Sequence, residues 1–307
     1  MNHFLDISDH SSVELQDLLD LAIKLKKDHF LGINPGLFEG KVLGMIFQKP
    51  SLRTRVSFDM AMRHLGGDAL YLSPNEIGLG KREAIADIAR VLSGYVEAVM
   101  ARVFEHEHVL ELAKWSTVPV INGLSDHSHP CQAMADALTI QEKFGKRKGI
   151  NVTFVGDGNN VAVSLMQIST KLGWNFTMAN PEGYNMPDGE IDAAKKLALN
   201  TGSKITFLND AHDAVKGAQV VYTDTWTSMG QEEEGAIREK VFPPFQVNKK
   251  LVDLADKDVI VMHCLPAHRN HELTDEVADG PHSYIFQQAH NRLHAQKAIL
   301  ARLFNVA

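Results

Sequence analysis

Residues 42–65 read VLGMIFQKPSLRTRVSFDMAMRHL, and this stretch says most about the fold. The apolar run at 42–47 predicts a buried strand, and apolar residues at helical spacing over 56–65 predict a helix. The polar segment PSLRTR at 50–55 joins the two. Because a helix begins with free backbone N–H groups and the positive end of its dipole, this arrangement predicts an anion site.

The side chains of this segment suit a phosphate. Ser51 and Thr54 offer hydroxyl groups that can donate hydrogen bonds. Arg53 and Arg55 offer guanidinium groups that can fork onto phosphate oxygens. The sequence has no GxxxxGK[ST] segment, which excludes a nucleotide P-loop. A capped helix start with solvated arginines is the plainer alternative.

Length and composition set outer bounds on the function. The 307 residues predict about two domains, and 44% hydrophobic with 22% charged residues is typical of a globular protein. A net charge of -7 predicts no nucleic-acid partner, so local arginines must handle any small anion. No apolar run reaches the roughly 18 residues of a membrane helix, and no signal peptide is recognisable. Only Cys131 and Cys264 are present, which fits a reducing cytoplasm, and neither has zinc-site spacing with histidines.

Strand and helix patterns alternate along the whole chain. Nine apolar runs predict strands, at 42–47, 69–72, 98–101, 118–121, 152–155, 176–179, 205–208, 220–222 and 259–262. Pro119 places its run at a sheet edge or a strand start. The last helical pattern covers 290–304. Such alternation predicts an α/β fold with two doubly wound parallel-sheet domains. The basic, glycine-containing break at 145–149 predicts a boundary between residues 1–147 and 148–287.

Polar clusters recur at the carboxyl ends of the predicted strands, where α/β sheets bind ligands. They are SLRTR at 51–55, Arg102, HPCQ at 129–132 and HCLP at 263–266. His129 and Gln132 open a predicted helix and can both reach a ligand there, although plain helix punctuation explains them equally well.

A second group of candidates lies in the second half of the chain. Asp224 follows a predicted strand and can hold a cationic amine, while Ser228 and the backbone near Gly230 can hold a carboxylate. An ordinary polar loop is the alternative. Cys264 is either a packing residue or a functional thiol, and its setting before Pro266 predicts a tight turn in which a cis peptide can occur.

The segment GDGNNV at 156–161 resembles a dinucleotide-binding loop. Val161 stands at the third glycine position, and Asn180 follows the next strand where an acidic residue would bind a ribose. A two-domain dehydrogenase is therefore an alternative with two features against it. A small-anion binding protein without catalysis is another, and the presence of candidate groups in both halves counts against it.

Taken together, the motifs resemble the aspartate/ornithine carbamoyltransferase family. The resemblance rests on SLRTR at 51–55, HPCQ at 129–132, Asp224 with SMG at 228–230, and HCLP at 263–266, in this order and at these separations. It continues to NRLHAQK at 291–297. Each motif alone is moderately specific, whereas four in register are highly specific.

The resemblance implies carbamoyl transfer from carbamoyl phosphate to the δ-amine of L-ornithine, giving L-citrulline and phosphate. Arg102, His129 and Cys264 would be the catalytic residues, Cys264 by orienting the amine. The residues implied for carbamoyl phosphate are Ser51, Leu52, Arg53, Thr54, Arg102, His129, Gln132, Cys264, Leu265 and Arg292. Those implied for ornithine are Asn160, Asp224, Ser228 and Met229. No metal and no organic cofactor is expected.

The resemblance also implies a trimer, or a multiple of trimers, with shared active sites, and a C-terminal helix (288–307) that packs back on the first domain. A neighbour's loop, here 73–83, would reach into each site. The commoner glutamine is replaced by Gly78, so we expect Lys81 or Arg82 to make the contact in trans. Leu52 replaces the commoner threonine, and only its backbone would contribute.

Within the family the amine acceptor is the open choice. An aspartate enzyme would need extra basic residues, and an enzyme for N-acylated ornithine would lose the partner of Asp224. A putrescine enzyme has no carboxylate to hold and would need Ser228 less. Asp224 together with SMG at 228–230 favours ornithine.

Overall fold

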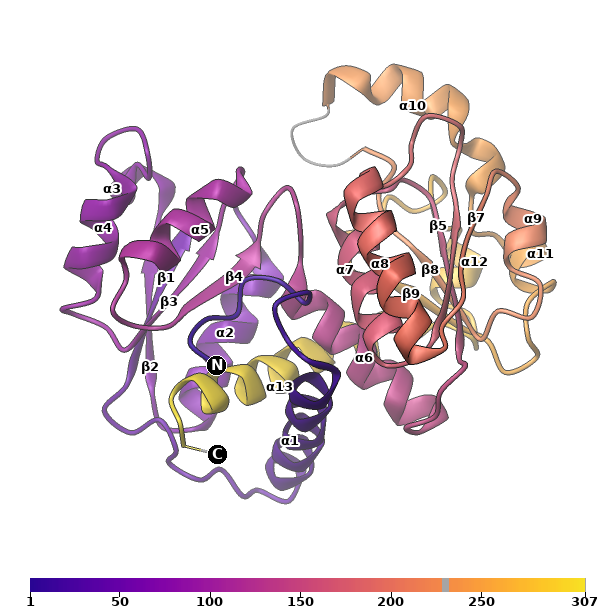
Figure 1. Ribbon diagram of the computed structural model, residues 1–307. Helices are drawn as coiled ribbons and strands as arrows, with labels where there is room; N and C mark the ends of the chain where they lie inside the picture. Colours follow the sequence, from indigo (N-terminus) through magenta and orange to yellow (C-terminus); the bar gives the residue numbers. More distant parts are fainter. Residues whose placement is uncertain (228–231, 307) are drawn as a thin grey trace. The chain divides into compact units, whose positions relative to one another are not determined.

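The computed structural model describes residues 1–227 and 232–306. The chain forms two compact units, Met1–Leu138 with His290–Ala307, and Thr139–Ala289 (Figure 1). Both units are α/β, each with its own parallel sheet, which confirms the predicted fold class. A search of the described residues finds no helix with the length and apolar character needed to cross a membrane.

The first unit contains a four-stranded parallel sheet in the order β2-β1-β3-β4. Its strands are β1 (Val42–Phe47), β2 (Asp68–Leu72), β3 (Ala98–Arg102) and β4 (Val120–Leu124). β3 is buried along its whole length, and β1 is buried from its second residue, as central strands of a covered sheet should be. β4 lies at the edge and starts directly after Pro119, as predicted.

Helices cover the sheet of the first unit. They are α1 (Ser12–Phe30), α2 (Leu52–His64), α3 (Pro74–Ile77), α4 (Ile85–Leu92), α5 (His106–Trp115), the start of α6 (Pro130–Phe144) and most of α13 (Ile285–Leu303). One core cluster joins Ile46 and Val99 of the sheet to Ile88 of α4 and Val109 of α5. The C-terminal part of α13 belongs to this unit, which confirms the predicted return of the last helix.

The sequence patterns above did not predict α1, although it is 19 residues long. Its start carries a capping box, in which the Ser11 hydroxyl accepts from the Glu14 N–H and the Glu14 carboxylate accepts from the Ser11 N–H. Buried residues at helical spacing follow, namely Leu15, Leu18, Leu19, Ala22 and Leu25. Both signals were present in the sequence and identify the helix in retrospect.

The second unit contains a five-stranded parallel sheet in the order β7-β6-β5-β8-β9. The strands are β5 (Asn151–Val155), β6 (Asn175–Ala179), β7 (Ile205–Leu208), β8 (Val220–Thr223) and β9 (Ile260–His263). The helices are α7 (Asn160–Lys171), α8 (Asp188–Thr201), α9 (Ala211–Ala214), α10 (Gly235–Val241), α11 (Lys249–Val252) and α12 (Asp275–Ala278). All nine predicted strands are therefore present, with ends that shift by at most three residues.

Each sheet has one topological switch point. In the first unit the chain passes from β1 outward to β2 and then returns to β3 on the other side of β1. In the second it passes from β5 outward to β6 and β7 and returns to β8. The crevice beyond the carboxyl ends of such strand pairs is where open α/β sheets bind ligands. We therefore expect ligand-binding residues at the carboxyl ends of β1 and β3 in the first unit, and of β5 and β8 in the second.

A basic cluster lies where α13 runs beside α1 in the first unit (Figure 1). Lys26 Nζ donates to Asn291 Oδ1 at 2.7 Å, and the rings of His29 and His64 stack with centroids 4.4 Å apart. Lys297 is fully buried in α13, and among the described residues its Nζ has no hydrogen-bond partner. Burial lowers the pKa of Lys297 to about 8. Burial first, and then nearby Lys297, lowers the pKa of His294 to about 3.

We predict that Lys297→Met stabilises the protein at pH 7 by about 1–4 kcal/mol, because it removes a buried charge. The folded-state pKa of Lys297 lies below its unfolded value, so the unfolded state holds more protons between about pH 8 and pH 10.5. The free energy of unfolding of the wild type should therefore include a term that rises with pH over that range, and the variant should lack this term. Denaturant unfolding from pH 7 to 10.5 measures both effects.

Lys24→Met, on the exposed face of α1, is the matched control and should leave the pH profile unchanged. A Lys297→Met protein that is less stable at pH 7, with the wild-type pH profile, would contradict the prediction.

Candidate functional site

The first candidate region lies at the end of β1, where Ser51 caps α2. The Ser51 hydroxyl accepts from the Thr54 N–H at 3.2 Å, so the plainer interpretation of this segment, a capped helix, is correct as far as it goes. Leu52 is the first residue of α2, and its side chain is 75% exposed. Arg55 lies over the ring of Tyr71, with its Cζ 4.1 Å from the ring centre, which assigns it to packing.

Two guanidinium groups converge on the hydroxyl of Thr54, which is fully buried. Arg292 Nη2 donates to Thr54 Oγ1 at 2.8 Å, and Arg102 Nη1 approaches the same oxygen at 3.5 Å. The three residues come from α13, β3 and α2, so segments far apart in sequence meet at this oxygen. Three residues that the sequence analysis assigned to one anion are thereby brought together.

His129 lies next to this cluster, immediately before α6. Its side chain is almost fully buried, and burial is the main reason why its pKa falls well below the usual range. The positive charges of Arg292, Arg102 and Arg53 lower the pKa further. His129 is therefore neutral at physiological pH and can donate a hydrogen bond without carrying a charge. Gln132, one turn further along α6, is also buried.

The second candidate region lies at the ends of β5 and β8. Asp224 follows β8 and accepts two hydrogen bonds: Asn159 Nδ2 donates to Oδ2 at 2.8 Å, and Cys264 Sγ donates to Oδ1 at 3.1 Å. Because Cys264 donates, it acts as a thiol here rather than as a nucleophilic thiolate. Asn159 was not among the candidates of the sequence analysis, and Asn160 stays a predicted ornithine ligand. The expected ornithine ligands at positions 228 and 229 lie outside the described residues.

The geometry of residues 156–161 argues against the dinucleotide alternative. Asn159 Oδ1 accepts from the N–H groups of Val161 and Ala162, which are the donors that a pyrophosphate would use. A Cβ on Gly158 would lie 2.3 Å from the Met186 nitrogen, so this glycine is needed for a close backbone contact. The loop is thus already filled by the protein's own groups.

A buried pair shapes the turn at 263–266. His263 Nδ1 accepts from the Leu265 N–H at 2.8 Å, and His263 Nε2 donates to Glu272 Oε1 at 3.0 Å. Both side chains are essentially inaccessible to solvent. Leu265 has φ of 60°, and its bond to Pro266 is cis, which the sequence analysis allowed for. His263 therefore holds the backbone that carries Cys264 and Leu265.

Asp224, His263 and Cys264 place possible metal-ligand atoms within 4.8 Å of one another. Both ring nitrogens of His263 already have partners, Leu265 and Glu272. A metal ion would have to break one of these bonds, so we assign these three residues to hydrogen bonding.

Arg238 of α10 was not found by sequence reasoning. Its Nη1 lies 2.9 Å from Asp157 Oδ2 and donates to the Trp226 carbonyl at 2.8 Å, and its Nη2 lies 3.0 Å from Glu234 Oε2. Burial raises the pKa of Asp157 to about 6, although Arg238 opposes this. Arg238 thus ties the loop after β5 to the segment after Asp224. Only the i,i+4 pair of Glu234 and Arg238 was visible in the sequence.

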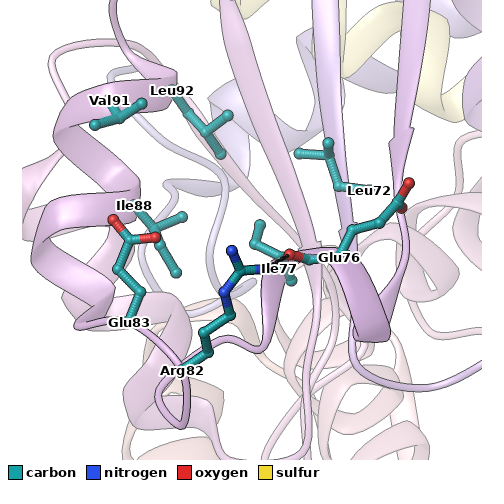
Figure 2. A pocket seen from close by; sticks show the side chains of 8 residues that line it. All are labelled: Leu72, Glu76, Ile77, Arg82, Glu83, Ile88, Val91 and Leu92. Atoms are coloured by element: carbon teal, nitrogen blue, oxygen red, sulfur yellow. Dashed lines mark hydrogen bonds between the residues drawn. The ribbon is translucent and has the colours of Figure 1, made fainter.

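The segment expected to act in trans, 73–83, lies beside a pocket of about 190 Å³ in the first unit. Figure 2 shows Arg82 at this pocket between Glu76 and Glu83, and Arg82 Nη1 donates to the Glu76 carbonyl at 3.0 Å. Gly78 has φ of 53°, and a Cβ there would lie 2.7 Å from Arg82 Cβ, so this loop conformation requires glycine. Lys81 is exposed.

Both halves of the chain match models of one protein family. Residues 2–142 match the model "Aspartate/ornithine carbamoyltransferase, carbamoyl-P binding domain", and residues 148–303 match "Aspartate/ornithine carbamoyltransferase, Asp/Orn binding domain". The chain belongs to the aspartate/ornithine carbamoyltransferase family.

Relatives of this chain include a protein of Pyrococcus furiosus named anabolic ornithine carbamoyltransferase. The two are 55% identical over 97% of this chain and 94% of the relative. A solved ornithine carbamoyltransferase structure from the same organism has a TM-score of 0.95, over 98% of this chain and 96% of that one. A solved N-acetyl-L-ornithine transcarbamylase is 32% identical, with a TM-score of 0.89, over 99% of this chain and 100% of the other.

We predict that two substitutions of His263 separate its two contacts. His263→Asn can keep an acceptor for the Leu265 N–H and loses Glu272, whereas His263→Gln keeps a donor for Glu272 and leaves the Leu265 N–H unpaired. An unpaired buried group costs about 1–3 kcal/mol, so His263→Gln should lower kcat/KM by roughly 10–100-fold. His263→Asn should be the more active and the less stable of the two, because it leaves Glu272 buried without its partner.

Steady-state carbamoyl-transfer kinetics and denaturant unfolding on both variants provide the comparison. If one variant is worse in both activity and stability, His263 has a single structural role and the prediction is wrong.

Proposed function

We propose that this chain is an enzyme that transfers the carbamoyl group of carbamoyl phosphate to the δ-amine of L-ornithine, producing L-citrulline and phosphate. The observation that carries the proposal is the convergence of Arg102 and Arg292 on buried Thr54, beside neutral His129. Guanidinium groups in this arrangement offer several charge-assisted donors to a phosphate. The acceptor is inferred from Asp224 and from the names of the relatives at 55% identity.

The N-terminus of α2 binds the phosphate group. Ser51, the Leu52 N–H, Arg53 and Thr54 provide donors at the positive end of the helix dipole. Arg292 adds a guanidinium group from α13. The phosphate is also the leaving group, so these contacts stabilise the charge that grows on it as the C–O bond breaks.

Arg102, His129 and Thr54 activate the carbonyl group of carbamoyl phosphate. They donate toward the carbonyl oxygen and stabilise the oxyanion of the tetrahedral intermediate. A neutral His129 donates its N–H without losing a proton, which suits a reaction in which no charge on the enzyme changes. Gln132 contacts the carbamoyl end.

The amine acceptor is held by the second unit. Asp224 pairs with the α-amino group, Asn160, Ser228 and Met229 hold the rest of the amino acid, and Cys264 with the Leu265 carbonyl orients the δ-amine. The fixed pair of Asn159 and Cys264 on Asp224 keeps its carboxylate in one orientation. The δ-amine must be neutral to attack, and its pKa lies near that of lysine, about 10.4. The new N–C bond forms, the C–O bond to phosphate breaks, and the amine proton leaves with phosphate.

We further infer a cytoplasmic homotrimer, or a multiple of trimers, without a metal or organic cofactor. Residues 1–147 would bind carbamoyl phosphate, 148–287 would bind ornithine, and 288–307 would complete the first domain. Arginine biosynthesis is the pathway that the name of the P. furiosus relative supports, since that name specifies the anabolic enzyme.

Citrulline formation by the purified protein tests the substrate assignment. Carbamoyl phosphate is supplied with L-ornithine, L-aspartate, N-acetylornithine or putrescine in parallel. We expect turnover with L-ornithine and at most a few per cent of that rate with the others. N-acetylornithine lacks the free α-amine that pairs with Asp224, putrescine lacks the carboxylate, and L-aspartate carries a second carboxylate that needs extra basic residues. Preference for another amine would overturn the acceptor, and absence of turnover with all four would overturn the enzyme assignment.

The loop in trans is tested by complementation. Lys81→Ala with Arg82→Ala should raise the KM for carbamoyl phosphate, with Lys81 the larger contributor because Arg82 already donates to Glu76. If sites are shared, co-refolding this double variant with inactive Arg102→Ala should restore about a quarter of the sites by random mixing.

Restoration to no more than the sum of the two separate variants would show that each site is complete within one chain. A wild-type KM in both single alanine variants would show that neither residue contacts carbamoyl phosphate.

A further inference from the structure

Gln132 and Asp136 form a buried hydrogen-bonded pair on successive turns of α6. Gln132 Nε2 donates to Asp136 Oδ1 at 2.8 Å. The exposed fractions of the two side chains are 1% and 0%. The pair belongs to the first unit, on the same helix that His129 precedes. Neither residue belongs to the phosphate-binding turn, and Asp136 has had no role so far.

The pair fixes the orientation of the Gln132 amide. An ionised carboxylate accepts hydrogen bonds and cannot donate one, so the group that faces Asp136 must be the –NH2 of Gln132. The hydrogen bond from Gln132 Nε2 to Asp136 Oδ1 therefore sets the orientation of the amide. The Gln132 carbonyl oxygen, Oε1, faces away from Asp136.

Gln132 Oε1 is buried, and among the described residues it has no hydrogen-bond partner. A buried acceptor without a partner costs free energy, about 1–3 kcal/mol, and a ligand with a donor relieves that cost. Carbamoyl phosphate carries such a donor in its –NH2 group. The other groups assigned to the carbamoyl end, on Arg102, His129 and Thr54, are donors suited to its carbonyl oxygen.

We propose that Asp136 is a positioning residue that makes this site select a carbamoyl group over other acyl phosphates. It holds Gln132 Oε1 as the acceptor for the carbamoyl –NH2, a contact that acetyl phosphate, with a methyl group there, cannot make. The inference rests on the proposed function, because it names how the carbamoyl phosphate of that reaction is distinguished from its analogue.

Asp136→Asn tests the proposal with little change in volume. An asparagine can present either its oxygen or its –NH2 to Gln132, so the amide loses its fixed orientation. We expect the KM for carbamoyl phosphate to rise about tenfold, the loss of roughly one oriented hydrogen bond. The competitive inhibition constant of acetyl phosphate should stay within about twofold of wild type, because that ligand makes no contact through a –NH2. Distortion of the site would weaken both ligands together.

The exchanged pair, Gln132→Glu with Asp136→Asn, provides the rescue. The introduced glutamate can accept from the –NH2 of the introduced asparagine with one oxygen and offer the other to the carbamoyl –NH2, and the buried charge is conserved. The ratio of the inhibition constant of acetyl phosphate to the KM for carbamoyl phosphate should return to within about threefold of its wild-type value. This double variant also serves if Asp136→Asn alone does not fold.

Three outcomes would overturn the inference: equal weakening of both ligands in Asp136→Asn, an unchanged KM for carbamoyl phosphate, or no recovery of discrimination in the exchanged pair. Failure of the proposed function is distinguishable, because wild-type protein would then form no citrulline. The inference is tested only against a wild-type enzyme that does.

Discussion

Like charges gathered around one hydroxyl group are the constraint on which the first unit depends. Arg102 and Arg292 approach Thr54, and Arg53 lies close enough to act on His129. Buried cations repel one another, so the fold must hold them from separate rigid elements. β3, α2 and α13 supply one residue each, which explains why the last helix of the chain returns to the first unit.

In the second unit the candidate region is built around an anionic group rather than around cations. Its central group is the carboxylate of Asp224, which two hydrogen bonds hold in one orientation. Neutral donors do this, the amide of Asn159 and the thiol of Cys264, so the negative charge is not neutralised in advance. The nearby cation Arg238 forms ion pairs with Asp157 and Glu234 instead. Both units place these groups at the switch point of a parallel sheet.

The sequence predicted what local patterns control and missed what distant contacts control. Strands and most long helices followed from apolar spacing, and Pro119 marked an edge because a missing N–H has a local consequence. α1 was missed although its capping box was readable. By contrast, the contact of Asn159 with Asp224 depends on a side chain that turns toward a residue 65 positions away. No local pattern contains that information, and the same is true of Arg238 and Asp157.

Hydrogen-bond polarity connects these observations. The groups that surround the carbamoyl phosphate residues are almost all donors: guanidinium groups, backbone N–H groups, a hydroxyl and a neutral imidazole. Donors alone bind the oxygens of any acyl phosphate and cannot tell one acyl group from another. An acceptor for the carbamoyl –NH2 can make that distinction, and the proposed acceptor is the Gln132 oxygen, whose direction is set by the hydrogen bond from the Gln132 –NH2 to Asp136. Asp136 provides this fixed partner one helical turn from Gln132, and its buried carboxyl group accepts from the Gln132 –NH2 at 2.8 Å.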